Sequence, residues 1–241
     1  MNYGIQMYSV RDITGTDLAG ALKAVADLGY SFVEFAGFFG NSAEDVKKML
    51  DDNGLTVSGT HTAWQELTAD RIDETIAYHK IIGNKNIIIP GADISTREKL
   101  DDLIALINEA QPKLAAAGIT LGFHNHHREF IPTEYGAYVH KELEEKTSVA
   151  FEIDTYWVYV AGVDPVATLE RLKDRVSVIH IKDGDKDGHG KALGEGTAPV
   201  AAVREKAIDL GMTMVVESET CDPTGVEEVG RCIKYLRSLE G

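Results

Sequence analysis

Asp154, His180 and Glu217 have the chemistry of a metal site, and each ends a short apolar run of the sequence. An ionised group at the end of a buried strand carries a desolvation cost unless it is paired or coordinated. Carboxylates that converge on one point also repel each other unless a cation neutralises them. With one further ligand, these three residues form a mixed oxygen and nitrogen donor set that suits Mn²⁺, Co²⁺, Mg²⁺ or Zn²⁺.

A second group of titratable residues lies in the stretch FHNHHREF, at positions 123–130, which follows another apolar run. It contains three of the chain's eight histidines within four positions. His124 and His126 alternate onto one face of an extended chain, whereas His127 and Arg128 are expected in the loop that follows. We therefore expect this stretch to place acid–base groups beside the metal. The strand that contains it, the fifth along the chain, is also expected to supply the fourth ligand.

Glu34, His61 and Glu152 also interrupt apolar segments near their ends. Each has a structural alternative, because a buried histidine can be a hydrogen-bonded core residue and a glutamate can pair with a neighbouring cation. Glu152 precedes Asp154 by two positions, so both face the same side of a strand. We expect Asp154, which is nearer the strand end, to bind the metal and Glu152 to support it.

The elements that must position these residues are strands alternating with helices along the whole chain. Eight strands are expected, at residues 3–10, 31–36, 56–62, 86–90, 120–126, 149–156, 176–183 and 212–219. Eight strand–helix units in 241 residues fit a closed (β/α)₈ TIM barrel, in which functional residues collect at the C-terminal ends of the strands. No glycine-rich phosphate turn follows the first strand, which argues against an open doubly wound sheet. We predict a single barrel domain over residues 1–241.

Composition limits the classes of partner. The sequence carries 24 lysines and arginines against 39 aspartates and glutamates, a net charge of −15. A surface this acidic repels polyanions and no basic cluster offsets it, so nucleic acid is not expected as a partner. The two cysteines are too few for a disulfide scaffold. No apolar run approaches the ~20 residues that span a bilayer and the first residues do not resemble a signal peptide, so we expect a cytoplasmic protein without a membrane partner.

Taken together, the motifs resemble the xylose isomerase-like TIM barrel superfamily, in its sugar phosphate isomerase/epimerase group and in a subgroup with the pattern HNHxxEF. The resemblance covers essentially the whole chain. It rests on the segments GIQMYSVRD (4–12), GYSFVEF (29–35), VSGTH (57–61), HNHHREF (124–130), FEIDTYW (151–157), HIKD (180–183), LGEG (193–196) and VVE (215–217).

The resemblance implies a divalent ion, most often Mn²⁺, held by a carboxylate from the fifth strand together with Asp154, His180 and Glu217. Many members have Glu-Asn-His in the fifth strand, where this chain has His124 followed by Asn125 and His126. The expected carboxylate is therefore missing, and Glu129 is the nearest candidate to replace it as a metal ligand. The departure also points towards keto-sugar and keto-glycoside substrates.

The resemblance implies an isomerase or epimerase of a small sugar or keto-sugar, phosphorylated or not, which acts through an enediolate. His124 and His126 are the expected bases, and Lys182 is expected to stabilise or protonate the enediolate oxygen. The residues expected to contact the hydroxyls and the apolar face of the sugar are Glu34, His61, Trp64 and Trp157. The alternatives are a metal-dependent lyase or dehydratase of a keto-polyol or keto-glycoside, similar to inosose dehydratase, and a sugar-binding barrel without activity. Barrels of this kind often form homo-oligomers, and the sequence does not fix the number of subunits.

Overall fold

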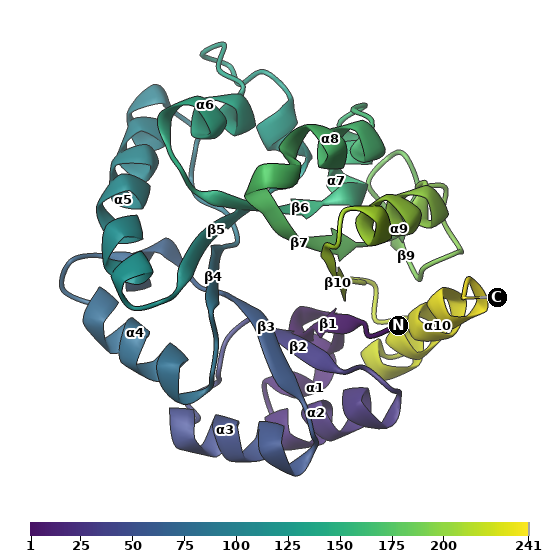
Figure 1. Cartoon of the computed structure of the whole chain (residues 1–241). Helices are drawn as coiled ribbons and strands as arrows, with labels where there is room; N and C mark the ends of the chain where they lie inside the picture. The colour runs from purple at the N-terminus through teal and green to yellow at the C-terminus, as the bar shows by residue number, and fades with distance from the viewer. Residues whose placement is uncertain (241) are drawn as a thin grey trace.

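Eight parallel strands close into a barrel in the order β1-β10-β7-β6-β5-β4-β3-β2 in the computed structural model, which describes residues 1–240 (Figure 1). The strands are β1 (Gly4–Gln6), β2 (Phe32–Phe35), β3 (Thr56–His61), β4 (Asn86–Ile89), β5 (Thr120–His124), β6 (Ala150–Asp154), β7 (Val176–Ile181) and β10 (Thr213–Val216). All eight predicted strands are present, each within its predicted range. The single-domain (β/α)₈ barrel is confirmed.

An outer ring of helices surrounds the barrel (Figure 1). The helices are α1 (Arg11–Thr14), α2 (Leu18–Asp27), α3 (Ala43–Asp52), α4 (Ile72–Ile81), α5 (Arg97–Ala116), α6 (Val139–Lys146), α7 (Thr155–Val160), α8 (Pro165–Leu172), α9 (Val200–Asp209) and α10 (Gly225–Ser238). Side chains cap several of them: Ser42, Thr96 and Thr224 each accept a hydrogen bond from the backbone N–H three residues later. Apolar residues spaced three or four apart then form the buried face of each helix, as on α5.

The repeated order of helix, glycine and strand has a conformational cause. Gly29, Gly118 and Gly211 follow α2, α5 and α9 with φ of 94°, 76° and 67°, in the left-handed region that a residue with a side chain rarely adopts. Each glycine therefore ends its helix and turns the chain into the next strand.

Short elements occupy the loops at the C-terminal ends of the strands. They are the 3₁₀ helices η1 (Met7–Val10), η2 (Trp64–Leu67) and η3 (His127–Phe130), and a hairpin of β8 (Asp183–Gly184) and β9 (Gly190–Lys191); a further 3₁₀ turn, η4 (Lys173–Arg175), precedes β7. Strand β1 is shorter than the predicted 3–10 because the side chain of Gln6 accepts a hydrogen bond from Tyr8 N, which begins η1.

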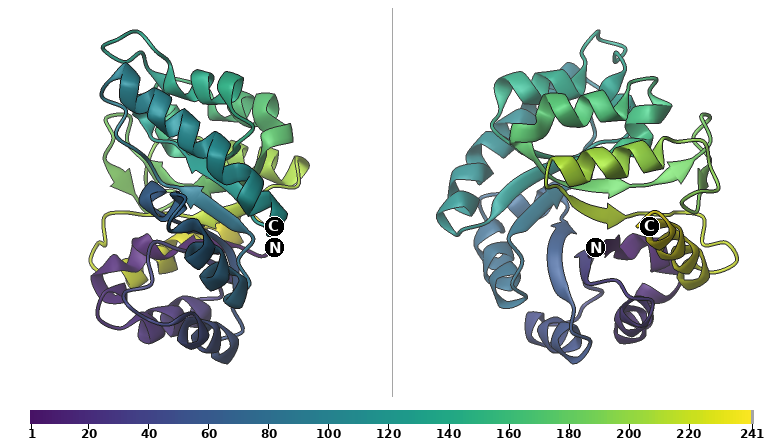
Figure 2. Two further views of the ribbon diagram at one scale, coloured as in Figure 1. Left: turned by 90° about the vertical axis from the view of Figure 1, so that its left-hand side faces the viewer. Right: turned by 45° about the vertical axis from the view of Figure 1, so that its right-hand side comes forward.

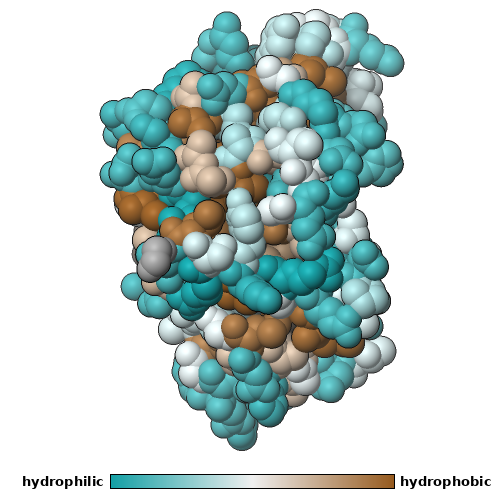
Figure 3. Space-filling view, turned by 90° about the vertical axis from the view of Figure 1, so that its right-hand side faces the viewer, coloured by the Kyte–Doolittle hydropathy of each residue, from teal (hydrophilic) through white to brown (hydrophobic). Residues whose placement is uncertain are grey.

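The termini meet at the opposite end of the barrel (Figure 2), where the amino group of Met1 lies 3.2 Å from Glu240. On the side of the molecule that carries α9 and α10, hydrophilic side chains predominate and hydrophobic ones appear between them in separate areas (Figure 3). Within residues 1–240, no helix combines the length and the apolar composition needed to cross a membrane.

Candidate active site

Four strands bring His124, Asp154, His180 and Glu217 together at the C-terminal end of the barrel. One potential ligand atom from each lies within 4.8 Å of the others, and all four residues are buried. His124 and Asp154 end β5 and β6, His180 lies near the end of β7, and Glu217 directly follows β10. The three predicted ligands are therefore adjacent, and the strand-five residue that joins them is His124.

Strand register fixes these neighbours. Asp154 pairs with His180 across β6 and β7, and the backbone N–H of Glu217 donates to Ile181 O at 3.2 Å. Successive side chains of a strand alternate between the barrel interior and the helix layer, so residues two apart point to the same side. Glu152 therefore projects inward one step deeper than Asp154, where it is level with His124.

The donors have the charge pattern of a cation site. Glu34, Glu152, Asp154 and Glu217 are four buried carboxyl groups, and Lys182 is the buried ammonium group among them. Three carboxylate oxygens are buried without a hydrogen-bond partner among residues 1–240: Asp154 Oδ2, Glu34 Oε2 and Glu152 Oε1. Burial raises the pKa of Asp154 to about 7, and Lys182 beside it opposes the shift. Unpaired buried carboxyl oxygens are costly, so the cluster fits a divalent ion that would neutralise them.

The atoms of His180 support the same conclusion. Its Nε2 lies 2.7 Å from Glu34 Oε1, and its Nδ1 lies 3.3 Å from Glu217 Oε2. Ligand atoms bound to one ion at about 2.0–2.2 Å stand roughly 3–3.6 Å apart. Burial alone would lower the pKa of His180, but Glu152, Glu34 and Glu217 raise it well above its ordinary value, so negative charge surrounds the ring.

Lys182 lies over the donor group. Its Nζ is 3.1 Å from Glu217 and 2.7 Å from Glu219, and it stands 4.9 Å from the centre of the Trp157 ring. Burial acts to lower the pKa of Lys182, but Glu217, Asp154 and Glu219 outweigh it and raise the pKa above its ordinary value. The side chain is therefore held as a cation.

His126 and Trp157 pack beside the cluster. The ring of His126 lies 5.1 Å from His124 and 6.0 Å from Trp157 between centroids. Burial lowers the pKa of His126 and so favours the neutral imidazole. His126 Nδ1 and Trp157 Nε1 have no hydrogen-bond partner within residues 1–240. Both side chains thus retain polar groups for a bound molecule.

Glu34 and His61 form a deeper layer with Glu152. Glu34 accepts a hydrogen bond from Gln6 Nε2 at 2.7 Å, and His61 Nε2 lies 2.7 Å from Glu152 Oε2. Burial acts to raise the pKa of Glu34, but His180 and His61 lower it to about 2. Burial lowers the pKa of His61 to about 4. Gly59 leaves room for this layer, since a Cβ there would lie 2.9 Å from Glu34 Oε2.

The structure does not bring Glu129 into the donor group. Its carboxylate is buried and accepts hydrogen bonds from the backbone N–H of His126 at 2.8 Å and from Arg128 Nε at 2.9 Å. These bonds hold the start of η3. The geometric groups of potential metal donors within residues 1–240 contain His124 in its place.

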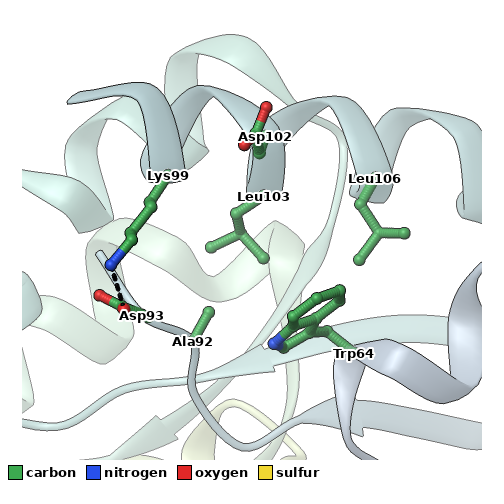
Figure 4. A pocket seen from close by; sticks show the side chains of 7 residues that line it. All are labelled: Trp64, Ala92, Asp93, Lys99, Asp102, Leu103 and Leu106. Carbon is green, nitrogen blue, oxygen red and sulfur yellow. Dashed lines mark hydrogen bonds and ion pairs between the residues drawn. The ribbon is translucent and has the colours of Figure 1, made fainter. Parts of the chain in front are cut away.

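Trp64 lies apart from the donor group, in a pocket on the rim of the barrel (Figure 4). Its indole is 37% exposed and faces Leu103 and Leu106 of α5, and the ion pair of Lys99 and Asp93 stands at the other end of the pocket. The pocket has a volume of about 270 Å³. A second cavity, of about 320 Å³, reaches His61 between the loops after β2 and β3 and the helix α4.

Asp183 holds the LGEG segment (193–196) in place, a role that the sequence did not predict. Its buried carboxylate accepts hydrogen bonds from the backbone N–H groups of Gly184, Gly194, Gly196 and Ala198, at 2.8 to 3.1 Å. A Cβ at Gly196 would lie 2.3 Å from that carboxylate. The segment is therefore a loop wrapped around Asp183, one residue after Lys182.

Comparisons with known proteins agree with this geometry. The family model described as xylose isomerase-like TIM barrel matches residues 22–239. None of the curated proteins matches the chain. A solved structure of a sugar phosphate isomerase/epimerase from Parabacteroides distasonis is similar at 27% identity and a TM-score of 0.84, over 98% of this chain and 97% of that one.

Two more distant structures share the fold. One is an L-ribulose 3-epimerase, at 15% identity and a TM-score of 0.75 over 99% of this chain and 94% of that one. The other is a probable 3-DHS dehydratase involved in petrobactin synthesis, from Bacillus anthracis, at 14% identity and a TM-score of 0.77 over 98% of this chain and 99% of that one. The family model matches nine tenths of the sequence, and the closed barrel with buried donors at its C-terminal end agrees with that match. The chain therefore belongs to the xylose isomerase-like TIM barrel family.

Proposed function

We propose that the protein is a divalent-metal-dependent isomerase or epimerase of a small sugar or keto-sugar. The observation that carries the proposal is the buried group of His124, Asp154, His180 and Glu217, whose converging donor atoms fit a divalent cation. Its similarity to a sugar phosphate isomerase/epimerase supports the substrate class.

His124, Asp154, His180 and Glu217 would hold the ion, with His124 in the place of the strand-five carboxylate of many relatives. We prefer His124 to Glu129 because Glu129 already accepts two hydrogen bonds away from the cluster. Imidazole and carboxylate donors in equal number suit Mn²⁺, and Co²⁺, Zn²⁺ and Mg²⁺ are the ions to compare with it.

A divalent ion held there would act as a Lewis acid towards a substrate carbonyl. His126 is the base in this proposal, because it is neutral and adjacent, whereas the free electron pair of His124 is used in holding the ion. Lys182 would stabilise negative charge on the substrate oxygen as a fixed cation and would not donate its proton. Removing a proton from the carbon next to the carbonyl, and returning it to a neighbouring carbon or to the other face, gives isomerisation or epimerisation.

The remaining predicted residues are assigned to binding. His61 and Glu34 would contact substrate hydroxyls from below, and the indole of Trp157 would form one wall. Trp64 stays a predicted contact for a substrate long enough to reach the rim pocket.

Incubation of the Mn²⁺-loaded protein with candidate ketoses in deuterated buffer tests the proposal. We expect deuterium at the carbon next to the carbonyl, together with a second sugar isomer. A metal-loaded protein that exchanges no proton of any ketose or keto-glycoside would contradict enolisation.

A metal-dependent lyase or dehydratase of a keto-polyol or keto-glycoside is the second candidate. The structural similarity to a probable dehydratase and the histidine at the end of strand five favour it. The same incubation separates the two, because a lyase releases water or a glycosyl leaving group and an isomerase retains every substituent.

A further inference from the structure

One oxygen of Glu152 faces three imidazole rings. Glu152 Oε2 lies 2.7 Å from His61 Nε2, 3.1 Å from His124 Nδ1 and 3.2 Å from His180 Nε2. Beside a bound cation Glu152 is a carboxylate, and a carboxylate oxygen only accepts hydrogen bonds. The three ring nitrogens that face Oε2 are therefore the ones that carry hydrogen.

This arrangement decides between two overlapping sets of potential donors. One set contains His124 and His180 with Asp154 and Glu217, and the other contains the same two histidines with His61 and Glu152. A neutral imidazole has one free electron pair, so each shared histidine can bind an ion in only one set. An ion bound by the set with Asp154 and Glu217 would neutralise both of these carboxylates. An ion bound by the other set would leave Asp154 and Glu217 without a bound ion, so the first set is favoured.

We propose that Glu152 is a positioning residue, which fixes the protonated nitrogen of His124 directly and helps Glu34 to fix that of His180, so that the opposite nitrogen of each ring faces the ion. The inference rests on the proposed metal centre. It assigns hydrogen to Nδ1 of His124 and to Nε2 of His180. Nε2 of His124 and Nδ1 of His180 then remain as ligands, and the latter is the nitrogen that lies beside Glu217.

Glu34 supports the same assignment for His180. Its Oε1 lies 2.7 Å from His180 Nε2 and is held from the other side by Gln6. Within residues 1–240, Glu152 is the hydrogen-bond partner of the His124 ring. His124 therefore depends on Glu152, whereas His180 depends chiefly on Glu34, and a carboxylate behind a metal-bound histidine sets both its orientation and its basicity.

Calorimetric titration of Mn²⁺ into metal-free protein tests the proposal in four chains: wild type, Glu152→Met, Glu152→Gln and Glu129→Gln. The Met variant keeps the length of the side chain but has no acceptor, and we expect it to bind Mn²⁺ about 10- to 100-fold more weakly. The Gln variant retains an acceptor oxygen and should lose less. Glu129→Gln is the matched control, since it removes a buried carboxylate of the same region that bonds to the backbone of His126 and to Arg128 instead of to the rings of His124 and His180, and its affinity should equal that of wild type.

Thermal unfolding of the metal-free proteins separates positioning from folding. Glu152→Met leaves the buried N–H groups of His61 and His124 without their acceptor, so we expect it to unfold at a lower temperature than wild type but still cooperatively, and a cooperative transition shows that the titrated protein is folded. If the Met variant fails to fold, the Gln variant provides the test, and we expect it to bind Mn²⁺ more weakly than wild type and Glu129→Gln do. In Zn²⁺-loaded protein with ¹⁵N-labelled histidine, wild type and Glu129→Gln should show slowly exchanging protons on Nδ1 of His124 and Nε2 of His180, and Glu152→Met should lose that protection at His124.

The outcomes distinguish this inference from the proposed function. A wild-type protein that takes up no divalent ion overturns both. A wild type that binds Mn²⁺ while Glu152→Met binds it equally well overturns the positioning role alone. Protons found on the opposite ring nitrogens would also overturn it.

Discussion

The two halves of the barrel contribute different parts of the site. Strands β5, β6, β7 and β10 supply every proposed metal ligand and Lys182. Strands β1 to β4 supply Glu34 and His61, which lie beneath the ligands, and β4 ends in Ile87, Ile88 and Ile89 without any titratable group. We call β5, β6, β7 and β10 the ligand half, and it concentrates negative charge. We call β1 to β4 the wall half, whose side chains line the space beside the ligands and offer hydrogen-bonding groups to it.

One carboxylate from each half illustrates the difference. Glu34 and Asp154 are equally buried carboxylates near strand ends, yet burial and charge leave them with opposite pKa shifts. Glu34 is paired with imidazole nitrogens and with Gln6, so its charge is already stabilised. Asp154 accepts a hydrogen bond from Trp157 N, and burial outweighs the nearby Lys182 and raises its pKa. Of these two carboxylates, the proposed ligand is the one whose charge the protein stabilises less.

The largest effect is expected when the ligand half loses a carboxylate. Asp154→Ala should abolish Mn²⁺ uptake, a greater loss than the roughly hundredfold that removal of a supporting residue causes. Metal content after dialysis against Mn²⁺ measures it. The metal-free variant should remain folded, because the substitution costs about 1 kcal/mol for the hydrogen bond from Trp157 N that caps α7 and removes the cost of burying Oδ2. Stoichiometric uptake by Asp154→Ala would place the ion elsewhere and break the division between the halves.

Strand five provides a sharper comparison within the ligand half. His124→Ala should weaken Mn²⁺ binding by at least about a hundredfold, because it removes a ligand, and Glu129→Gln should leave it unchanged. Calorimetry on the two variants gives the answer directly. The reverse result would return the metal to Glu129 and would require η3 to rearrange.

The sequence predicted the barrel well because its signals are local and repeated. Alternating strands and helices, with a glycine after helices such as α2 and α5, determine both the fold and the end at which Asp154, His180 and Glu217 collect. Register then brings together residues whose positions along their strands were visible in the sequence.

What the sequence left open depends on contacts between distant segments. Glu129 is five residues from His124, and only the turn of η3 shows that its carboxylate is used by His126 and Arg128. The role of Glu152 depends on three histidines from three other strands, and that of Asp183 on backbone groups 11 to 15 residues away. Spacing from Asp154 was the available signal for Glu152, and none was available for Asp183.

Packing in the wall half is the next prediction. Gly59→Ala would bring Cβ within 2.6 Å of Ile88 Cδ1 and 2.9 Å of Glu34 Oε2, so we expect a loss of about 1–3 kcal/mol in the free energy of unfolding. Urea denaturation of the metal-free protein measures the loss. Gly122→Ala is the matched control, because its Cβ would meet Ile88 at 3.1 Å and should cost less. Equal stability of Gly59→Ala and wild type would show that Glu34 is loosely held.

The smallest effect is expected from a substitution that weakens the binding of substrate and leaves the binding of metal unchanged. His61→Gln removes an imidazole of the wall half that touches Glu34 and Glu152 but none of the proposed ligands by a hydrogen bond. We expect unchanged affinity for Mn²⁺ and a loss of roughly tenfold in kcat/KM, the worth of one hydrogen bond to a substrate hydroxyl. Trp64→Phe should change neither quantity for a single sugar ring, because Trp64 lies in the rim pocket. If His61→Gln lowered metal affinity as much as Glu152→Met, the wall half would share in holding the ion, since Glu152 would then depend on His61 for its own position.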